Sequence, residues 1–363
     1  MNNHGPDQDM NRPLPILRPA SPAASQPAVR DITIPRVAVI VPAYGVAHLL
    51  PEALSSVQAQ TLCDWECVVV DDGAPDDVAG AVGPFLDDPR MTFLQTGNGG
   101  VSSARNRAIA ETRAPYIALL DGDDLLRPTY LEQMVNALEA DPQARLATCN
   151  ARIFGAVPRD CTCFTRKQGR GDGTRGSLPE VLDQSFKIYI GSTFRRDDHE
   201  SVGGFDTTMT HAEDFDFWVR LVLLGGHALY LDDILGDYRV RGNSASASSA
   251  KMLKGNIRVF EKALDLIDAN TEPAEIARAM IEENERQLRF EQAIDRVIDG
   301  DRAAIAEMQA ARGHELGRAW NVAFVVWKFL PALAAPLLRY RRQKHARGAI
   351  SAAGMRAISQ AIG

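Results

Sequence analysis

The sequence predicts an α/β fold in which a mainly parallel sheet is flanked by helices and followed by an α-helical extension. Three observations predict it. Short, β-branched, almost wholly apolar runs recur early in the chain, and stretches with apolar residues at helical spacing separate them. After about residue 250 only helical patterns continue. Strands that alternate with helices are joined by right-handed crossovers, which makes the sheet mainly parallel.

The strands are predicted from runs that are apolar on both faces, as in strands covered on both sides. There are four: "RVAVIVPAY" (36–44), "WECVVVDDG" (65–73), "MTFLQTG" (91–97) and "YIALLDGDD" (116–124). Helical spacing predicts helices over 46–60 and 101–112. The run "HAEDFDFWVRLVLLGG" (211–226) predicts a further helix, with acidic residues at its start and two glycines at its end. Residues 228–248 follow as a strand or two and a polar loop.

Changes of composition divide the chain into four parts. We expect a disordered Pro/Ala-rich leader (1–35), an α/β domain (36–250), a helical region (251–318) and an apolar and basic tail (319–363). The leader lacks the positive start and apolar run of a secretory signal.

The overall charge and the cysteines exclude some classes of protein. A net charge of −7 argues against a nucleic-acid partner, because such proteins are basic. Five cysteines, an odd number, do not suggest a disulfide framework. Neither Cys63 with Cys67 nor Cys161 with Cys163 has the further ligands of a zinc site. Reduced thiols in a cytoplasmic protein are the expectation.

Polar side chains follow three of the predicted strands. They are Tyr44 after the first strand, Asp71 and Asp72 after the second, and Asp121, Asp123 and Asp124 after the fourth. Ligands of open parallel sheets bind beyond the carboxyl ends of the strands, so these residues are expected at one edge. Crowded carboxylates need a cation, and hard oxygen ligands suit Mg²⁺ or Mn²⁺ with a phosphate-bearing ligand.

Other interpretations of these acids stay open. The cluster at 121–124 is also compatible with a turn and a helix cap before Pro128. Asp71 and Asp72 are alternatively caps of the loop after their strand. A calcium loop is rejected, because it needs an oxygen ligand where Leu125 stands and glycine where Leu126 stands.

Seven motifs, in this order, resemble the family 2 glycosyltransferases. They are "VIVPAYG", "VVVDDGAPD", "NGGVSSARNRAI", "YIALLDGDDLLRP", "VGGFD", "HAEDFDFW" and "YRVRGNSAS", and they run from about Arg36 to Ser248. The resemblance implies a GT-A fold for 36–250, a Rossmann-like, mainly parallel sheet. It also implies an inverting enzyme that uses nucleotide-diphosphate sugars.

The resemblance assigns roles to the residues at the strand ends. Pro42, Ala43 and Tyr44 would line the base pocket, and Asp71 or Asp72, preferably Asp72, would contact the nucleobase or ribose. The family's DxD motif falls on Asp121-Gly122-Asp123, followed by Asp124. One of these three carboxylates would bind Mn²⁺ or Mg²⁺, with Asp123 the first choice and Asp121 also a ribose contact. The ion would neutralise charge on the leaving nucleoside diphosphate.

The same resemblance places the catalytic base and a diphosphate loop. Asp214, the last acid of the "ED" pair, would take the proton of the acceptor hydroxyl, with Asp216 as its competitor. Arg239, Ser244 and Ser246 would close on the diphosphate. One departure is Arg241, which stands where members often have a metal-binding histidine. Guanidinium cannot ligate a cation, so the metal would depend on carboxylates, phosphates and water.

The apolar run "WNVAFVVWKFLPALAAPLL" (320–338) precedes the basic stretch "RYRRQKHAR" (339–347). Its length approaches a membrane span, but Lys328 lies near its middle and Pro331 and Pro336 interrupt it. An anchor lying on anionic lipid is favoured, ahead of packing against protein and of spanning. The expected location is therefore cytoplasmic, with peripheral contact at the inner face of a membrane.

The expected function is transfer of a hexosyl or N-acetylhexosaminyl group from a nucleotide-diphosphate sugar, a UDP-sugar by preference. The acceptor would be a hydroxyl of a glycan or lipid-linked acceptor in cell-surface glycan or polysaccharide synthesis. Two rivals remain: a nucleotidyltransferase, and a catalytically silent nucleotide-sugar-binding scaffold at the membrane.

Overall fold

The computed structural model describes residues 34–157, 159–164, 167–169, 172–241, 249–313 and 318–348. Three parts of the sequence interpretation lie outside these residues: nearly all of the predicted leader, the loop with Ser244 and Ser246, and the end of the tail.

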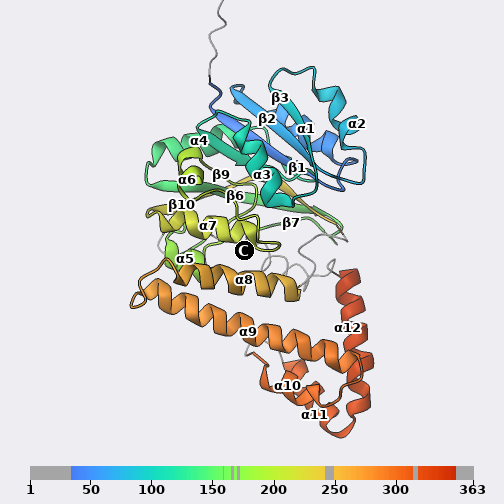
Figure 1. Ribbon diagram of the computed structural model, residues 1–363. Helices are drawn as coiled ribbons and strands as arrows, with labels where there is room; N and C mark the ends of the chain where they lie inside the picture. The colour runs from blue at the N-terminus through green and yellow to red at the C-terminus, as the bar shows by residue number, and fades with distance from the viewer. Residues whose placement is uncertain are drawn as a thin grey trace, which may run out of the picture. The chain divides into compact units, whose positions relative to one another are not determined.

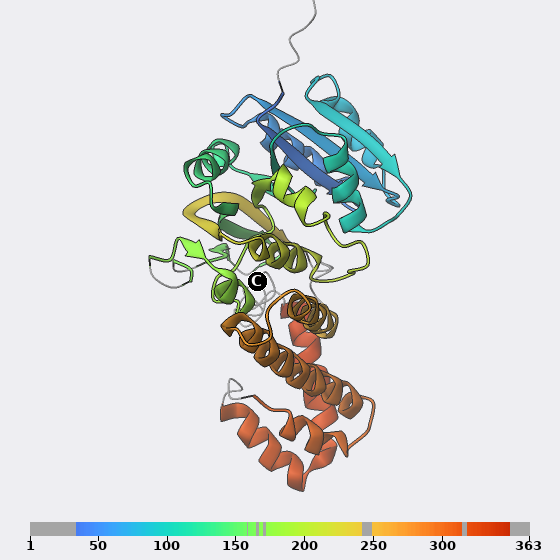
Figure 2. The ribbon, with the colours of Figure 1, turned by 60° about the vertical axis from the view of Figure 1, so that its left-hand side comes forward.

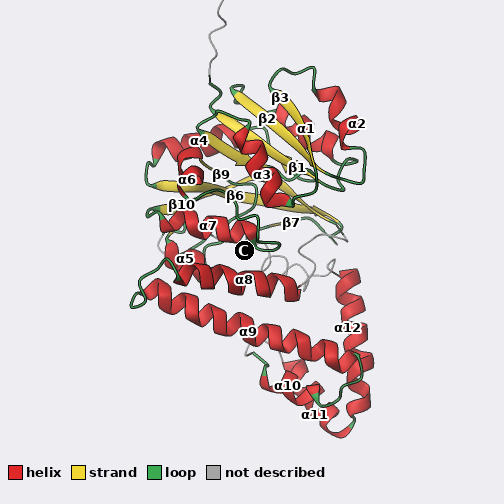
Figure 3. Ribbon diagram, in the orientation of Figure 1, coloured by secondary structure: helices red, strands yellow, loops and turns green. Residues whose placement is uncertain are grey.

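A single sheet of ten strands forms the framework of the protein (Figure 3). The strands are β1 (Val37–Ala43), β2 (Trp65–Asp72), β3 (Met91–Thr96), β4 (Tyr116–Leu119), β5 (Leu125–Leu126), β6 (Ala144–Gly155), β7 (Cys161–Thr162), β8 (Arg175–Gly176), β9 (Thr193–Arg195) and β10 (His227–Val240). Their order is β3-β2-β1-β4-β9-β6-β10-β5, with β7 beside β6 and β8 beside β10.

Helices connect the strands and continue alone after β10 (Figure 1). They are α1 (Leu50–Gln58), α2 (Val78–Val82), α3 (Val101–Ala110), α4 (Tyr130–Ala140), α5 (Leu178–Leu182), α6 (Arg196–Ser201), α7 (Glu213–Leu223), α8 (Ser249–Leu264), α9 (Glu272–Ile298), α10 (Ala304–Ala310), α11 (Arg318–Phe329) and α12 (Ala334–Gly348). Short 3₁₀ helices in the described residues include Gly83–Phe85 and Pro331–Leu333.

The direction of the strands confirms the predicted α/β class. β3, β2, β1 and β4 are mutually parallel, and β6 and β10 are parallel to each other. β9 is the antiparallel strand that joins the two groups. The chain order reverses between β1 and β4, and such a switch point is where open α/β sheets bind ligands.

The structure differs from the sequence prediction in several strands. The fourth run forms a strand only to Leu119, because the acidic residues after it make a turn. The long strand β6 was not predicted. Residues 227–240 form one strand, as the prediction of a strand or two allows, and its register shifts between Leu231 and Gly236, around Asp232 and Asp233.

Buried apolar side chains form two clusters. The larger one contains the sheet and its helices, and it also includes Val259 and Phe260 of α8 and Ala277 of α9. The smaller one joins the second half of α9 to α10, α11 and α12, with Phe290 and Trp327 among its members. Helices α8 and α9 pack side by side (Figure 2), so α9 takes part in both clusters.

Candidate active site at the carboxyl edge of the sheet

The ends of β1 and β2 lie next to each other. In the parallel register Pro42 faces Val70 and Ala43 faces Asp71. Ala43 is buried, whereas Tyr44, the first residue after the strand, is 53% exposed. Pro42, Ala43 and Tyr44 therefore lie beside Asp71 and Asp72, as the sheet geometry predicts.

The carboxylates of Asp71 and Asp72 are buried and accept hydrogen bonds from loops. Asp71 accepts from the backbone N–H of Ala74 at 2.8 Å and from Gln95 Nε2 at 3.2 Å. Asp72 accepts from the N–H groups of Gly99 and Gly100, each at 2.8 Å. Gly100 is the residue before α3, so Asp72 fixes the start of that helix. The loop-capping interpretation thus describes contacts that both residues make, whatever they bind in addition.

A third acid, Asp76, was missed in the sequence. Its two carboxylate oxygens accept from the backbone N–H groups of Gly45 at 3.0 Å and Ala47 at 2.6 Å. It therefore ties the loop after β2 to the loop that carries Tyr44. Asp76 lies inside the quoted motif "VVVDDGAPD", but its partners are about thirty residues away and leave no local signal.

Arg105 of α3 is the counter-charge of the acidic cluster. Its side chain is 2% exposed and lies 3.0 Å from Asp121 Oδ1 and 3.4 Å from Glu213 Oε1. One guanidinium therefore joins the end of β4 to the start of α7. The planar fork of arginine suits such a bridge between two carboxylates. Arg105 was not singled out in the sequence, although it lies within the third motif.

Two arginines at the end of β10 contact the other members of the cluster. The backbone N–H of Arg239 donates to Asp124 at 2.7 Å, and its Nε donates to the carbonyl of Asp123 at 2.8 Å. Arg241 Nε lies 2.6 Å from Asp123 Oδ2. Asp124 is buried and also accepts from Tyr189 Oη at 3.4 Å. The three aspartates thus divide into two that face cations and one that points into the protein.

Burial and mutual repulsion disfavour the charged forms of these acids. Burial raises the pKa of Asp123, and the neighbouring negative charge of Asp121 raises it further. Burial raises the pKa of Asp124 well above its ordinary value, with Asp123 adding to the effect. Cationic charge placed beside these acids therefore stabilises their charged forms.

Asp214 is the second residue of α7 and is half-buried. Burial raises its pKa to about 6, and the charge of Glu213 adds to the rise. The residue before the helix, Ala212, has φ +57°, the left-handed region that non-glycine residues rarely adopt. Strain of this kind is concentrated at functional sites, and here it lies two residues before Asp214.

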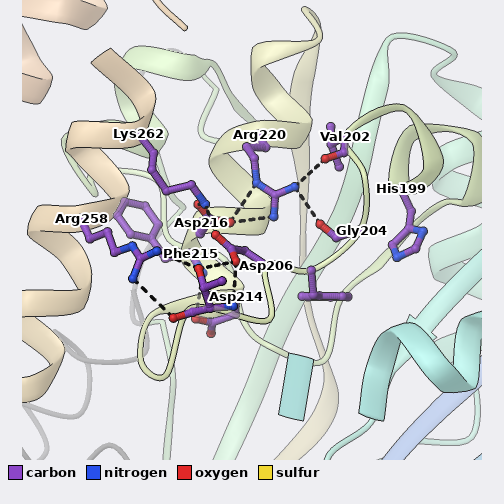
Figure 4. Close-up of polar contacts among 12 residues, drawn as sticks. His199, Val202, Gly204, Asp206, Asp214, Phe215, Asp216, Arg220, Arg258 and Lys262 are labelled. Atoms are coloured by element: carbon purple, nitrogen blue, oxygen red, sulfur yellow. Dashed lines mark hydrogen bonds and ion pairs between the residues drawn. The ribbon is translucent and has the colours of Figure 1, made fainter. Parts of the chain in front are cut away.

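Asp216, the competitor of Asp214 as base, has a structural set of partners (Figure 4). It is buried and accepts from Arg220 Nε at 2.8 Å and Nη2 at 2.6 Å, and it also pairs with Lys262 of α8. Asp206 accepts from Lys262 at 2.8 Å and from the backbone N–H of Thr208 at 2.8 Å. Asp206 therefore shapes a turn, and both carboxylate oxygens of Asp216 are paired with cations.

The donor set fits a divalent ion held partly by the protein. Within the described part of the chain, no group of three or more His, Cys, Asp or Glu side chains converges as a complete metal cage. Mg²⁺ bound beside phosphates typically takes one or two carboxylates and fills its other positions from phosphate and water. Asp123 and Asp121 supply the two carboxylates of that pattern, and each of their ion pairs with arginine involves one of the two carboxylate oxygens. Asp124 is hydrogen-bonded to Arg239 and Tyr189, so its position suits it to hold the neighbouring segments in place rather than to bind the ion.

Comparison with known proteins supports the resemblance found in the sequence. Residues 38–203 match the model of the family described as "Glycosyl transferase family 2". It is 36% identical to the uncharacterized glycosyltransferase EpsJ of Bacillus subtilis over 58% of its own length and 63% of EpsJ. It is 40% identical to the uncharacterized protein y4gI of Sinorhizobium fredii over 59% of its own length and 23% of y4gI. The chain thus spans less than two thirds of these relatives.

Solved structures confirm the predicted GT-A fold. The mannosyltransferase PcManGT from Pyrobaculum calidifontis, in complex with GDP-Man and Mn²⁺, superposes with a TM-score of 0.56. The two chains are 21% identical, and the match covers 91% of this chain and 87% of PcManGT. S. aureus TarS 1-349 in complex with UDP-GlcNAc also gives a TM-score of 0.56, at 17% identity, over 75% of this chain and 83% of TarS 1-349.

Proposed function

We propose that this protein is an inverting, metal-dependent glycosyltransferase of polysaccharide or cell-surface glycan synthesis. It moves a hexosyl or N-acetylhexosaminyl group from a nucleotide-diphosphate sugar, a UDP-sugar by preference, to an acceptor hydroxyl on a glycan or lipid. One observation carries the proposal. The base candidate Asp214 and the DxD motif lie at one site, because Arg105 joins Asp121 to Glu213, the neighbour of Asp214.

The residues have distinct parts in the proposed reaction. Asp214 accepts the proton of the acceptor hydroxyl while that oxygen bonds to the anomeric carbon from the face opposite the leaving group. The bond from the anomeric carbon to the diphosphate breaks, and the nucleoside diphosphate leaves with the electron pair. One displacement inverts the anomeric centre and needs no enzyme nucleophile. Pro42, Ala43, Tyr44, Asp71 and Asp72 are proposed to hold the nucleoside.

The cations of the site stabilise the leaving group. Arg239 and Arg241 lie beside Asp123 and Asp124 and are placed to donate to diphosphate oxygens. A divalent ion held by Asp123 and Asp121 would supply Lewis-acid stabilisation of the departing diphosphate. Ser244 and Ser246 stay a proposal from the sequence for the same diphosphate.

The test is a screen of nucleotide sugars with Mn²⁺ or Mg²⁺ for release of the nucleoside diphosphate. UDP-GlcNAc and GDP-Man come first, because solved proteins of this fold bind them. Asp214→Asn should reduce transfer by a factor of about 10³ or more and leave nucleotide affinity within about twofold. Asp233→Asn, at an exposed position of β10, is the matched control. Near-normal transfer by Asp214→Asn would reject Asp214 as the base.

The same screen separates the two rivals. A nucleotidyltransferase would release pyrophosphate instead of a nucleoside diphosphate. A catalytically silent scaffold would bind the nucleotide sugar but would not turn it over, whichever metal ion is added.

We further propose that α11 and α12 lie on anionic lipid. Within the described residues no helix is long and apolar enough to cross a membrane. The outer face of α11, the connection and α12 exposes a set of large apolar side chains: Val322, Val325, Val326, Phe329, Leu330, Leu333, Leu337 and Tyr340. Lys328 is exposed among them. An apolar face with basic residues beside it suits a negatively charged membrane surface.

A further inference from the structure

Arg241 lies between two parts of the proposed donor site. It is the first residue after β10, and its Nε lies 2.6 Å from Asp123 Oδ2. Its Nη1 also donates a long hydrogen bond, 3.5 Å, to the carbonyl oxygen of Gly45. Gly45 follows Tyr44 in the loop after β1. One side chain thus connects the loop proposed to hold the nucleoside with the carboxylate proposed to hold the divalent ion.

Arg241 is more open to solvent than the other two arginines of the site. The side chain of Arg105 is 2% exposed and is enclosed beside Asp121. The side chain of Arg239 is 15% exposed, and its guanidinium lies 4.5 Å from the centre of the Phe154 ring. The side chain of Arg241 is 27% exposed. Of the three guanidinium groups, that of Arg241 is therefore the one best able to change its anionic partner.

The position of Arg241 opposes a second cation at Asp123. Mg²⁺ bound by a carboxylate lies about 2.1 Å from its oxygen. At Asp123 such an ion would be close to the positive charge of Arg241, because the guanidinium already contacts the same carboxylate. Two like charges repel more strongly where little water separates them, and the side chain of Asp123 is 14% exposed. A divalent ion without an accompanying anion should therefore bind weakly.

A diphosphate reverses this effect. Its oxygens accept charge-assisted hydrogen bonds from arginine, whose planar guanidinium donates to two oxygens at once. The same oxygens fill the ligand positions of a divalent ion that one or two carboxylates leave open. With a diphosphate beside Asp123, Arg241 gains a partner of higher negative charge. The carboxylate of Asp123 then becomes available to the ion.

We propose that Arg241 couples the two ligands of the donor site: it opposes the divalent ion at Asp123 until a nucleoside diphosphate binds, and then donates to the diphosphate. The inference rests on the proposed function and adds an order of binding to it. By thermodynamic linkage, the ion and the nucleotide raise each other's affinity by the same factor. Removing the charge of Arg241 should shrink this factor, because the ion then binds well without the nucleotide.

The test measures Mn²⁺ binding to the full-length protein from the electron paramagnetic resonance signal of free Mn²⁺. Titrations are made without nucleotide and with UDP or GDP, with nucleotide alone as the blank. Without nucleotide, Arg241→Met should bind Mn²⁺ about tenfold more tightly than wild type, and the gain on adding nucleotide should be about tenfold smaller. Arg241→Lys keeps the positive charge, so its Mn²⁺ affinity without nucleotide should stay within about threefold of wild type.

Two further variants serve as controls. Arg127→Met removes another partly exposed arginine that pairs with an aspartate, Asp237, and should leave Mn²⁺ affinity within about twofold of wild type. Adding Asp123→Asn to Arg241→Met should abolish the tighter binding, which assigns that binding to Asp123.

Several results would overturn the coupling and leave the proposed function standing. They are Mn²⁺ binding by Arg241→Met that is no tighter than wild type, tighter binding that persists when Asp123→Asn is added, and tighter binding by Arg241→Lys to the same extent. Failure of the wild type to bind either nucleotide, with or without Mn²⁺, would instead overturn the proposed function and this inference together.

Discussion

Arg105 is the residue on which the arrangement of the acidic site depends. Its guanidinium is buried between Asp121 and Glu213, which belong to segments about ninety residues apart in the chain. Without it, Asp121 and Glu213 would lose the cation that pairs with both of them in a partly dry site. Arg107, two residues further along α3, is 52% exposed and pairs only with Glu111 among the described residues.

We predict that Arg105→Met lowers the free energy of unfolding by about 3 kcal/mol, because it leaves partly buried carboxylates without a partner. It should also abolish transfer, since Asp121 and the start of α7 lose their common contact. Arg107→Met is the matched control and should change stability by less than about 0.5 kcal/mol. Urea unfolding of both variants measures the difference. Equal stabilities would show that Arg105 does not organise the site.

The raised pKa of Asp214 predicts the acid limb of the pH profile. A general base must be deprotonated to accept a proton. Burial raises the pKa of Asp214 to about 6, and the negative charge of Glu213 is the second cause. Transfer should therefore be full well above pH 6 and fall about tenfold per pH unit below it. Glu213→Gln removes a neighbouring negative charge, so the pKa of Asp214 should fall and the limb should move to lower pH. Measuring kcat/KM against pH for both proteins tests this, and a limb that does not move assigns it to another group.

The sequence could predict the position of the site better than its internal contacts. Strand ends placed Tyr44, Asp72 and Asp123 at one edge, because that follows from the direction of parallel strands. The pairing of Arg105 with Glu213 crosses 108 positions and has no local pattern. One weak signal existed: Arg105 shares a helical face with the apolar residues Ala108 and Ile109, whereas Arg107 does not.

At the level of elements, α8 is part of the catalytic body although it follows the predicted domain boundary. Val259 and Phe260 lie in the same apolar cluster as the sheet. Gly255 allows the helix to approach the carbonyl of His211 closely, and the ion pairs of Lys262 hold its far end. The start of α7, and with it Asp214, is thus packed from one side by α3 and from another by α8.

This contact predicts that replacing Gly255 by alanine destabilises the protein, which is the opposite of the usual effect in a helix. Gly→Ala in a helix interior ordinarily stabilises by roughly 0.5–1 kcal/mol. Gly255→Ala should instead destabilise by about 1–3 kcal/mol, because its Cβ would lie 2.6 Å from a backbone oxygen and force α8 away. Transfer should fall with it, and Lys254→Ala in the neighbouring exposed position should be near neutral. Urea unfolding measures the change in stability, and a transfer assay measures the change in activity. A Gly255→Ala variant more stable than wild type would show that α8 does not pack this closely.

The elements differ in how far the sequence could predict them. β1 and β2 were predicted because both of their faces are buried and their residues are almost wholly apolar. β6 is also buried along most of its length, but Thr148 and Asn150 interrupt its apolar pattern. The hydroxyl of Thr148 accepts a hydrogen bond from the backbone N–H of Tyr189, a contact that no local sequence pattern predicts. β9, with three residues, is too short for any pattern.

At the level of the whole molecule, α9 connects the sheet to the terminal helices. Ala277 of its first half lies in the larger apolar cluster, and Phe290 and Ile294 of its second half lie in the smaller one. The inner face of α11 contributes Phe324 and Trp327 to the smaller cluster. The apolar tail therefore packs against protein with one face and exposes the other. Packing against protein describes the inner face, and lipid contact stays a prediction for the outer face.

This division of faces sharpens the test of membrane contact. Deleting residues 320–363 would also uncover the smaller cluster, so substitutions on the outer face are cleaner. Phe329, 75% exposed, and Leu333, 44% exposed, are changed together to glutamate. Losing two apolar side chains that would insert into the lipid should weaken binding to vesicles with anionic lipid by about tenfold or more, and salt should weaken it further. Leu266→Glu, on an exposed leucine after α8, is the control. Co-sedimentation with anionic and zwitterionic vesicles measures it, and equal binding of the double variant and wild type would rule out this face as the lipid contact.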